Sequence, residues 1–258
     1  MFIRNCSALA VVCALALVAS ACGGGAPEPT PAPAADTAAP AAAPGGGTGT
    51  GSIAGKVTFD GTVPPPEKVK VAADPTCQSM HPQGLEKQTV QVTDGGLAHV
   101  FVYVKSGVSG SYPAPSEPVL LDQQGCTYHP HVMGVQANQP IKIRNSDDTL
   151  HNIHPRPTIN AEFNIGQPRT GMESTKTFDK QEIMIPVGCD VHPWMRSYIS
   201  VVDHPFFAVS KDDGSFEIKG LPAGEYEVEA YHEKLKTASG RVTVKDGEAA
   251  TLDLSYKG

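Results

Sequence analysis

The sequence has little of what a nucleic-acid-binding protein or a multispan membrane protein needs. Its 258 residues carry 20 Lys and Arg against 27 Asp and Glu, a formal net charge of −7, and no run of basic residues. An acidic balance of this kind argues against nucleic acid as a partner. After the first 21 residues, no apolar stretch is long enough to cross a bilayer as a helix.

Several patterns that carry catalysis or cofactors are also missing. The chain has no Cys-x-x-Cys-His segment, so covalent haem attachment is not expected. Its residue spacing offers no Ser-His-Asp set and no pair of carboxylates for acid–base work. We therefore expect a protein that is not an enzyme.

The first 50 residues predict export and a tether. Residues 1–21 place one Arg before a short apolar run, which is typical of a signal peptide. Small residues precede Cys22, and this segment resembles the lipobox of bacterial lipoproteins, which implies lipidation of Cys22; ordinary secretion is the alternative. The Pro, Ala and Gly tract that completes residues 22–50 has too little apolar surface to fold. Because Gly23 follows the Cys, resemblance to Gram-negative lipoproteins implies a cell-envelope protein on the outer membrane, facing the periplasm.

Strand signals dominate the rest of the chain, and no long amphipathic helix stands out. In residues 100–104, three Val alternate with Phe101 and Tyr103, which predicts a strand buried on both faces. The Asp94-Gly95 pair before it is typical of a hairpin turn. Further strands are predicted at residues 118–122, 131–136, 141–145, 174–179, 182–187 and 197–202. Pro and Gly between them favour an all-β sandwich or barrel.

Residues 204–258 have a different pattern, with short alternating strands around the turn sequence GLPAG. They resemble the carboxypeptidase regulatory-like, or transthyretin-like, β-sandwich. Proteins of that group often begin with a strand like GSIAGKVTFDG, which here lies in residues 51–72. One hypothesis is a discontinuous small sandwich made of 51–72 and 204–258, with residues 73–203 inserted as a second domain. Two domains in tandem are the alternative.

The six cysteines divide by compartment. Two lie in the predicted signal peptide and Cys22 is the predicted lipid site, which leaves Cys77, Cys126 and Cys189. An exported protein can form a disulfide, but three cysteines leave one thiol over. Cys189 has His and Met neighbours, so we pair Cys77 with Cys126 and keep Cys189 free. A Cys126–Cys189 disulfide is the alternative, and it would abolish a metal site.

The segment CDVHPWM places Cys189, His192 and Met195 at intervals of three residues. The segment LHNIH upstream supplies His151. Two imidazoles, a thiolate and a thioether suit copper in both oxidation states, and two His, one Cys and a weak axial Met form the blue-copper arrangement. Zinc, by contrast, seldom uses Met. The sequence therefore predicts one copper ion.

These two segments resemble the ligand loops of the amicyanin and plastocyanin (cupredoxin) family. The resemblance implies a Greek-key β-sandwich and a type 1 copper site with His151, Cys189, His192 and Met195 as ligands. It makes Asn152 a hydrogen-bonding residue near the thiolate, between the two loops, whereas His154 matches a position that does not bind copper. The wider chain also resembles exported proteins described as methylamine-utilisation or plastocyanin-like.

The function expected from this resemblance is one-electron transfer at the cell envelope with a redox protein as partner. The resemblance implies that His192 presents its ring edge near the surface. Pro193 and Trp194, between two ligands, are the expected apolar docking residues. Two alternatives stay open: copper binding or delivery without electron transfer, and a structural or interaction β-sandwich lipoprotein with no metal.

Overall fold

The structure is a computed structural model, and it describes residues 49–258. The predicted signal peptide, the lipidation of Cys22 and the linker as far as residue 48 lie outside the described residues. Nearly all regular structure in the described part is β-strand, and its one helix has six residues, so the all-β prediction is confirmed. None of the described helices is long and apolar enough to cross a membrane.

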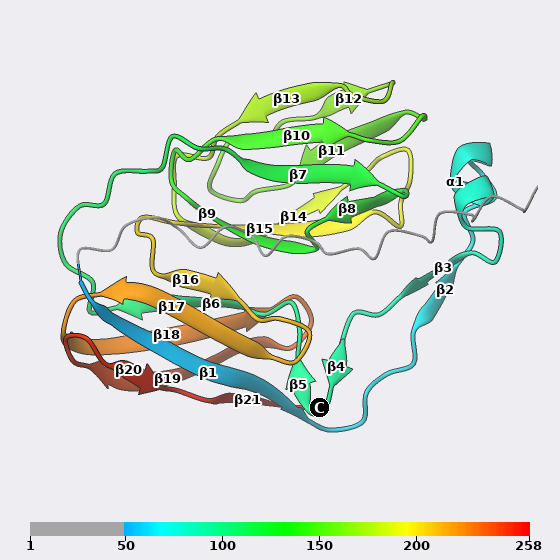
Figure 1. The fold of residues 1–258 in the computed structure, drawn as a ribbon. Coiled ribbons are helices and arrows are strands. Elements are labelled where there is room, and N and C mark those ends of the chain that lie inside the picture. Colours follow the sequence, from blue (N-terminus) through cyan, green and yellow to red (C-terminus); the bar gives the residue numbers. More distant parts are fainter. Residues whose placement is uncertain (1–48) are drawn as a thin grey trace, which may run out of the picture. The chain divides into compact units, whose positions relative to one another are not determined.

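Nine consecutive strands form what we call the site sandwich (Figure 1). One sheet has the order β13-β10-β7-β8 and the other the order β12-β11-β14-β15-β9. The strands are β7 (Val119–Gln124), β8 (Thr127–His129), β9 (Val132–Gln136), β10 (Ile141–Asn145), β11 (His151–Pro155), β12 (Ile165–Gln167), β13 (Glu173–Lys176), β14 (Glu182–Gly188) and β15 (Arg196–Val202).

Period-two burial explains why these segments form a sandwich. In β10, Ile141 and Ile143 are buried, whereas the Lys and Arg between them are partly exposed. Ile185 and Ile199 from the second sheet join these two residues in one apolar cluster. All six strands predicted between residues 118 and 202 are present, within a few residues of their expected ends.

A second pair of sheets forms the small sandwich. One has the order β17-β1-β5-β4, with β20 and β21 also paired to β1, and the other has the order β16-β6-β18-β19. The strands are β1 (Gly51–Asp60), β4 (Val92–Thr93), β5 (Gly96–Leu97), β6 (Phe101–Ser106), β16 (Phe207–Val209), β17 (Ser215–Leu221), β18 (Gly224–His232), β19 (Lys236–Val244), β20 (Ala249–Thr251) and β21 (Leu254–Lys257).

The small sandwich is discontinuous in sequence. Strand β1 pairs with β17, β20 and β21 from the end of the chain, and only the bridge between Thr58 and Gly96 joins it to β5. Strand β6 also lies in this sandwich, because it pairs with β16 and β18. The strand pairing therefore starts the site sandwich after Ser106, later than the expected boundary at residue 73.

Strand β6 is buried on both faces, as its sequence indicates. Val100, Val102 and Val104 pack into the core of the small sandwich. Phe101 and Tyr103 pack on the other side, in a cluster with Val132 and Val202 of the site sandwich. The strand thus lies between two apolar cores.

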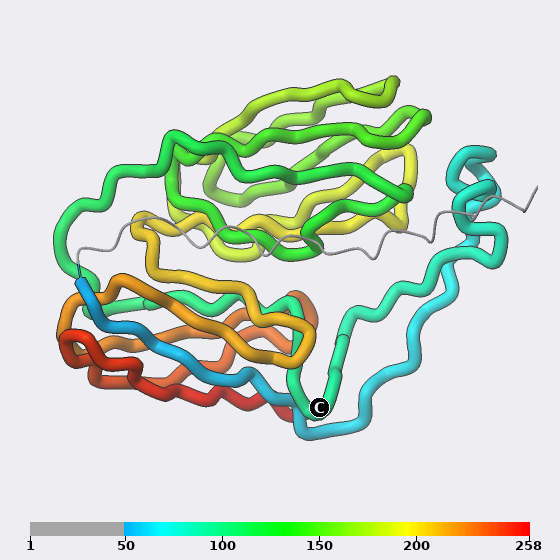
Figure 2. Tube along the Cα trace, viewed as in Figure 1, coloured from blue at the N-terminus to red at the C-terminus, as the bar shows by residue number. Residues whose placement is uncertain are grey.

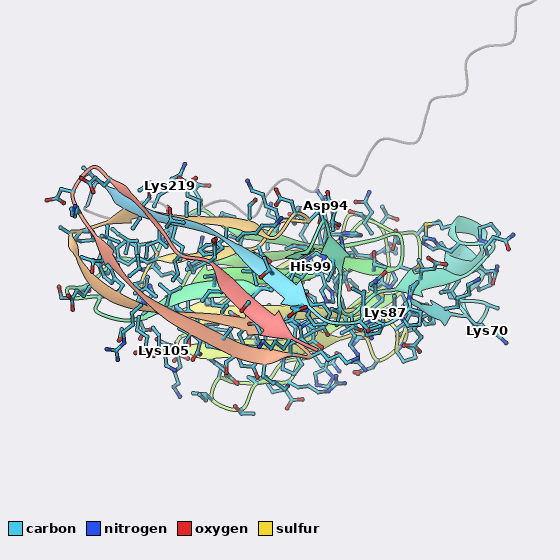
Figure 3. The ribbon with its side chains drawn as sticks, turned by 90° about the horizontal axis from the view of Figure 1, so that it is seen from below. Lys70, Lys87, Asp94, His99, Lys105 and Lys219 are labelled. Atoms are coloured by element: carbon cyan, nitrogen blue, oxygen red, sulfur yellow. A yellow bond between two sulfur atoms is a disulfide. The ribbon has the colours of Figure 1, made fainter. Side chains whose placement is uncertain are left out.

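The Asp94-Gly95 pair forms the expected turn between β4 and β5, and both residues have positive φ angles of 50° and 76°. His99 has a φ of 60° and separates β5 from β6, so the hairpin strands are shorter than expected. Figure 3 labels Asp94 and His99.

Between β1 and β4 the chain makes an excursion, drawn in cyan in Figure 2. The excursion contains a short hairpin, β2 (Glu67–Val69) with β3 (Leu85–Lys87), and the helix α1 (Pro75–Met80). Asp74 caps the helix by accepting a hydrogen bond from the Cys77 N–H, and Pro75 occupies the first turn. Asp74 and Cys77 of this segment contact His192 in the loop between β14 and β15.

Candidate metal centre

Two chain segments bring the predicted ligands together. His151 is the first residue of β11, and Cys189 follows the last residue of β14. The two strands are antiparallel neighbours with His154 opposite Gly188, so the loop after β14 lies beside the beginning of β11. The donor atoms of His151, Cys189 and His192 all lie within 4.8 Å of one another, and all three residues are buried.

The facing atoms are the ones that a copper site needs. Nδ1 of His151 lies 2.9 Å from Nδ1 of His192, and Sγ of Cys189 lies 3.8 Å from Nδ1 of His192. The His192 N–H donates to Sγ of Cys189, and the Met195 N–H donates to the His192 carbonyl at 3.0 Å. Met195 is 1% exposed and belongs to the same apolar cluster as Cys189. Two ring nitrogens and one sulfur therefore converge, with the thioether residue buried beside them.

The cluster favours an ionised thiol even without a metal. Burial raises the pKa of the Cys189 thiol, but hydrogen bonds with His151 and His192 outweigh it and lower the pKa to about 6. Burial lowers the pKa of His151, whereas its bonds to Asp147 and Cys189 raise it to about 9. A cation that bound these donors would replace the shared proton, since metals bind the thiolate and the neutral imidazole. The donor set thus fits copper chemically.

Asn152 ties the two ligand-bearing segments together. Its Oδ1 accepts a hydrogen bond from the Asp190 N–H at 2.7 Å and lies 3.2 Å from Sγ of Cys189. Its Nδ2 donates to Oδ1 of Asn164 at 2.7 Å. Asn152, on β11, therefore contacts both the sulfur of Cys189 and the backbone of the loop after β14.

His154 lies away from the three donors. Its ring nitrogens contact the carboxylates of Asp190 and Glu162, and Arg156 also donates to Asp190. Strand alternation explains the difference, because neighbouring histidines three residues apart on β11 point to opposite faces.

Asp147 holds the far side of the His151 ring. Its Oδ2 lies 2.8 Å from Nε2 of His151, and the carboxylate also accepts the N–H groups of Gly125 and Cys126, each at 2.7 Å. Burial raises the pKa of Asp147, but these hydrogen bonds lower it below its usual value. Nε2 therefore holds a proton against this carboxylate, and Nδ1 is the ring nitrogen left to bind a metal.

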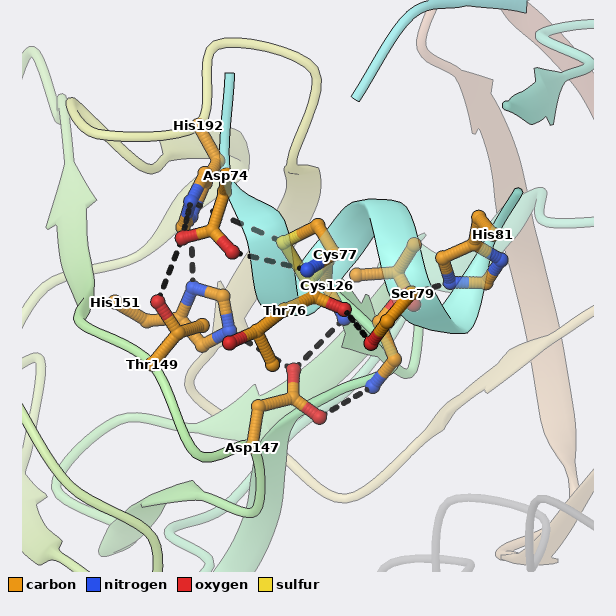
Figure 4. Close-up of a disulfide and its surroundings, with 12 residues drawn as sticks. Asp74, Thr76, Cys77, Ser79, His81, Cys126, Asp147, Thr149, His151 and His192 are labelled. Atoms are coloured by element: carbon orange, nitrogen blue, oxygen red, sulfur yellow. Dashed lines mark hydrogen bonds and ion pairs between the residues drawn. A yellow bond between two sulfur atoms is a disulfide. The ribbon is translucent and has the colours of Figure 1, made fainter. Parts of the chain in front are cut away.

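Asp74 holds the far side of the His192 ring in the same way (Figure 4). Its Oδ2 lies 3.2 Å from Nε2 of His192 and accepts a hydrogen bond from the Thr149 hydroxyl at 2.6 Å. Burial raises the pKa of Asp74, but bonds from Thr149, the Cys77 N–H and His192 lower it to about 2. Each histidine thus has its own carboxylate.

The expectation that the ring edge of His192 lies near the surface is wrong. His192 is 1% exposed, because α1 and the residue before it cover the ring. Nothing in the sequence places residues 74–77 against residue 192, since they are more than 110 residues apart.

A disulfide joins Cys77 to Cys126, and Cys189 is a free, buried cysteine. The alternative Cys126–Cys189 pair is therefore not formed. The Trp194 indole N–H donates to the Cys126 carbonyl at 3.1 Å, and the ring packs against the disulfide. Pro193 is exposed and Trp194 only partly so, and a docking role for the two stays a prediction.

Sequence reasoning missed both carboxylates. The pair Asp74-Pro75 was a signal for a helix start, because Asp is a preferred N-cap and Pro a preferred first residue. Nothing in the sequence signals that the same Asp reaches His192. Asp147 lies four residues before His151, but such proximity in a loop does not define a contact.

No family description matches this chain, and no curated protein matches it. Solved structures match in part. A Cu-containing nitrite reductase from Thermus scotoductus SA-01 is 20% identical over 38% of this chain and 25% of its own length, with a TM-score of 0.29. The match therefore spans about a quarter of that reductase.

An amicyanin mutant in the Cu(I) state is 17% identical over 39% of this chain and 97% of its own, with a TM-score of 0.29. A purple cupredoxin from Nitrosopumilus maritimus is 18% identical over 33% of this chain and 97% of its own, with a TM-score of 0.28. These likenesses concern the fold of about two fifths of the chain or less.

Proposed function

We propose that this protein is a one-electron carrier with a single type 1 copper ion bound by His151, Cys189, His192 and Met195. One observation carries the proposal: two ring nitrogens and a thiol sulfur lie within 4.8 Å of one another in a buried site. Copper in such a donor set alternates between its cuprous and cupric states.

The surrounding residues suit electron transfer because they fix the donors in place. Asp147 and Asp74 each bond one imidazole from behind, and Asn152 holds the backbone after Cys189. Donors held in this way move little when the charge at the site changes, and partners outside the ligand set tune its electronic properties. Burial of His151 and His192 keeps water away from the ring nitrogens.

We propose no enzymatic activity. Four protein donors leave no open position at which a substrate would bind, in contrast to catalytic metal sites. The transthyretin-like character of the small sandwich, the lipid anchor at Cys22 and the outer-membrane location facing the periplasm belong to the same proposal, and they rest on the sequence. The partner in this proposal is another redox protein of the cell envelope.

The test is to add Cu(II) to metal-free protein of residues 23–258, which leaves out the predicted signal peptide and lipid site, and to record the visible spectrum. A type 1 site gives an intense thiolate-to-copper band at about 600 nm. We expect that band at one copper per chain, and a reversible reduction measured by protein-film voltammetry. Absence of the band in a folded, disulfide-bonded protein would contradict the proposal.

Copper storage or delivery is the second candidate, and the burial of His192 favours it. A carrier needs a short path between the metal and its partner, whereas a storage site benefits from a covered ligand. A blue protein that releases copper to a chelator but exchanges electrons slowly with small redox reagents would support storage. A folded protein that binds no copper would leave the structural or interaction role.

A further inference from the structure

The segment from Val71 to Gly84, which we call the cap, contacts three loops of the site sandwich. Asp74 meets His192 and Thr149, and His81 Nε2 lies 2.8 Å from the Gly125 carbonyl. The Thr76 hydroxyl also contacts the Asp148 carbonyl. Figure 4 shows the cap residues, the disulfide and both site histidines together.

The apolar contact between the cap and the site sandwich is small. Its buried members are Val71, Cys77 and Cys126, with the partly buried Trp194 against them. Three of the six residues of α1 are exposed: Pro75, Ser79 and Met80. So few buried apolar groups give weak non-covalent attachment, because hydrophobic stabilisation scales with the area buried.

The covalent bond is therefore the strongest link between the cap and the site. Cys126 lies in the turn between β7 and β8, and its N–H donates to Asp147, the residue behind His151. Cys77 lies three residues after Asp74, and its N–H donates to that same side chain. Each half of the disulfide thus adjoins a carboxylate that bonds a site histidine.

We propose that Asp74 is a positioning residue of the copper site, and that the Cys77–Cys126 disulfide locks the cap over His192 until the disulfide is reduced. The proposal rests on the proposed copper function for its purpose, but the cap itself needs no metal. With the disulfide intact, Asp74 orients the His192 ring through Nε2. Without it, the cap detaches and the His192 edge becomes open to solvent, to a redox partner or to a copper donor.

The opening step is a thiol–disulfide exchange with an external dithiol. One thiolate of the dithiol attacks a sulfur of the Cys77–Cys126 bond, which breaks and leaves a mixed disulfide. The second thiol of the reagent displaces the remaining cysteine. The products are two protein thiols and the oxidised reagent, so the two electrons and two protons come from the dithiol.

Trp194 gives a direct test, because it is the single tryptophan of the chain. Its ring centre lies 5.0 Å from that of His192, and its indole bonds the Cys126 carbonyl. In metal-free protein of residues 23–258, acrylamide quenching of its fluorescence would be compared before and after reduction with dithiothreitol. The same measurement would be made on the C77S/C126S variant. We expect the quenching constant to rise about threefold in both open forms, with emission at longer wavelength.

The matched control is Ser79→Ala, on the exposed side of α1, which should quench like the wild type. An unchanged quenching constant after mass spectrometry has shown the disulfide to be broken would overturn the proposal. A rise together with loss of the β-sheet signal in circular dichroism would also overturn it, since the disulfide would then hold the sandwich rather than a cap.

The role of Asp74 is tested separately with Asp74→Asn in the copper-loaded protein. Asn keeps the helix N-cap but removes the negative charge beside Nε2 of His192. A weaker imidazole donor stabilises cupric copper less, so we expect a higher reduction potential with unchanged Trp194 quenching. An unchanged potential would overturn the positioning role. If no form binds copper, the proposed function fails, while the metal-free quenching experiment still decides the cap.

Discussion

The two β-sandwiches differ in what they bury. Within residues 49–258, the buried polar and charged side chains lie almost entirely in the site sandwich; Ser210 and His232 are the exceptions. The small sandwich has a larger and almost wholly apolar core. Burying a polar group costs free energy unless it is hydrogen-bonded, so the site sandwich depends on satisfied buried hydrogen bonds. The small sandwich is stabilised mainly by apolar packing.

The largest effect is expected from Cys189→Ser. The hydroxyl oxygen replaces the sulfur that gives the thiolate-to-copper band, so the absorption at about 600 nm should disappear. Stability should change little, because the substitution is nearly isosteric. Visible absorption and urea unfolding would be measured on the same sample. Retention of an intense band would mean that Cys189 does not bind the copper.

A matched pair of core truncations separates the two sandwiches next. Ile53 in β1 and Ile153 in β11 are both fully buried. Replacing either by Ala should lower the free energy of unfolding by about 2–5 kcal/mol. Only Ile153→Ala should also weaken copper binding, because β11 also carries His151 and Asn152. Isothermal titration with copper would measure this.

Equal loss of copper affinity in both variants would mean that the small sandwich shapes the site as well as supporting it.

Glu182→Gln tests a buried carboxylate of the site sandwich. Glu182 accepts hydrogen bonds from the Thr158 hydroxyl and from the N–H groups of residues 158, 159 and 160. Burial raises the pKa of Glu182, but these bonds lower it to about 2. The side-chain NH2 group of Gln would face N–H and O–H groups that also donate. We therefore expect the free energy of unfolding to fall by about 1–3 kcal/mol at pH 7.

The pH dependence of this variant has a defined sign. Because the pKa is lower in the folded state, ionised Glu182 stabilises the fold at pH values above its unfolded pKa. That contribution is lost as the pH falls from about 4.5 toward 2. Urea midpoints of wild type and variant should therefore converge in acid. A difference that stays constant from pH 7 to pH 3 would refute this account.

The local parts of this structure could be predicted from the sequence. Cys189, His192 and Met195 lie in one short loop, and period-two alternation marks strands such as residues 141–145. Counting cysteines predicted one free thiol, and the His and Met neighbours in the chain indicated Cys189. These features depend on neighbours in the chain, which sequence patterns describe.

The features that depend on distant contacts could not be predicted. Strand β11 contains two His and a Pro and has no apolar alternation, so its sequence resembles a loop. The burial of β6 on both faces was clear, but not the sandwich to which it belongs. Asp74 contacts His192 because the segment between β1 and β4, two strands of the small sandwich, extends to the site sandwich.

The smallest expected effect concerns the junction of the two sandwiches. Nε2 of His131, just before β9, lies 2.6 Å from Oε1 of Glu233, just after β18. Burial raises the pKa of Glu233, but His131 lowers it below its usual value. Glu233→Gln should lower the free energy of unfolding by about 1 kcal/mol, because one charge-assisted hydrogen bond is weakened.

A surface control and two probes turn this small change into a test of coupling. Lys219→Gln removes an exposed ion pair with Glu217 and should cost less than about 0.5 kcal/mol. Trp194 fluorescence follows the site sandwich alone, whereas circular dichroism follows both. If the sandwiches unfold as one unit, Glu233→Gln shifts both urea midpoints equally. A shift of the circular-dichroism midpoint alone would mean that the small sandwich unfolds independently. It would then add nothing to the stability of the site sandwich.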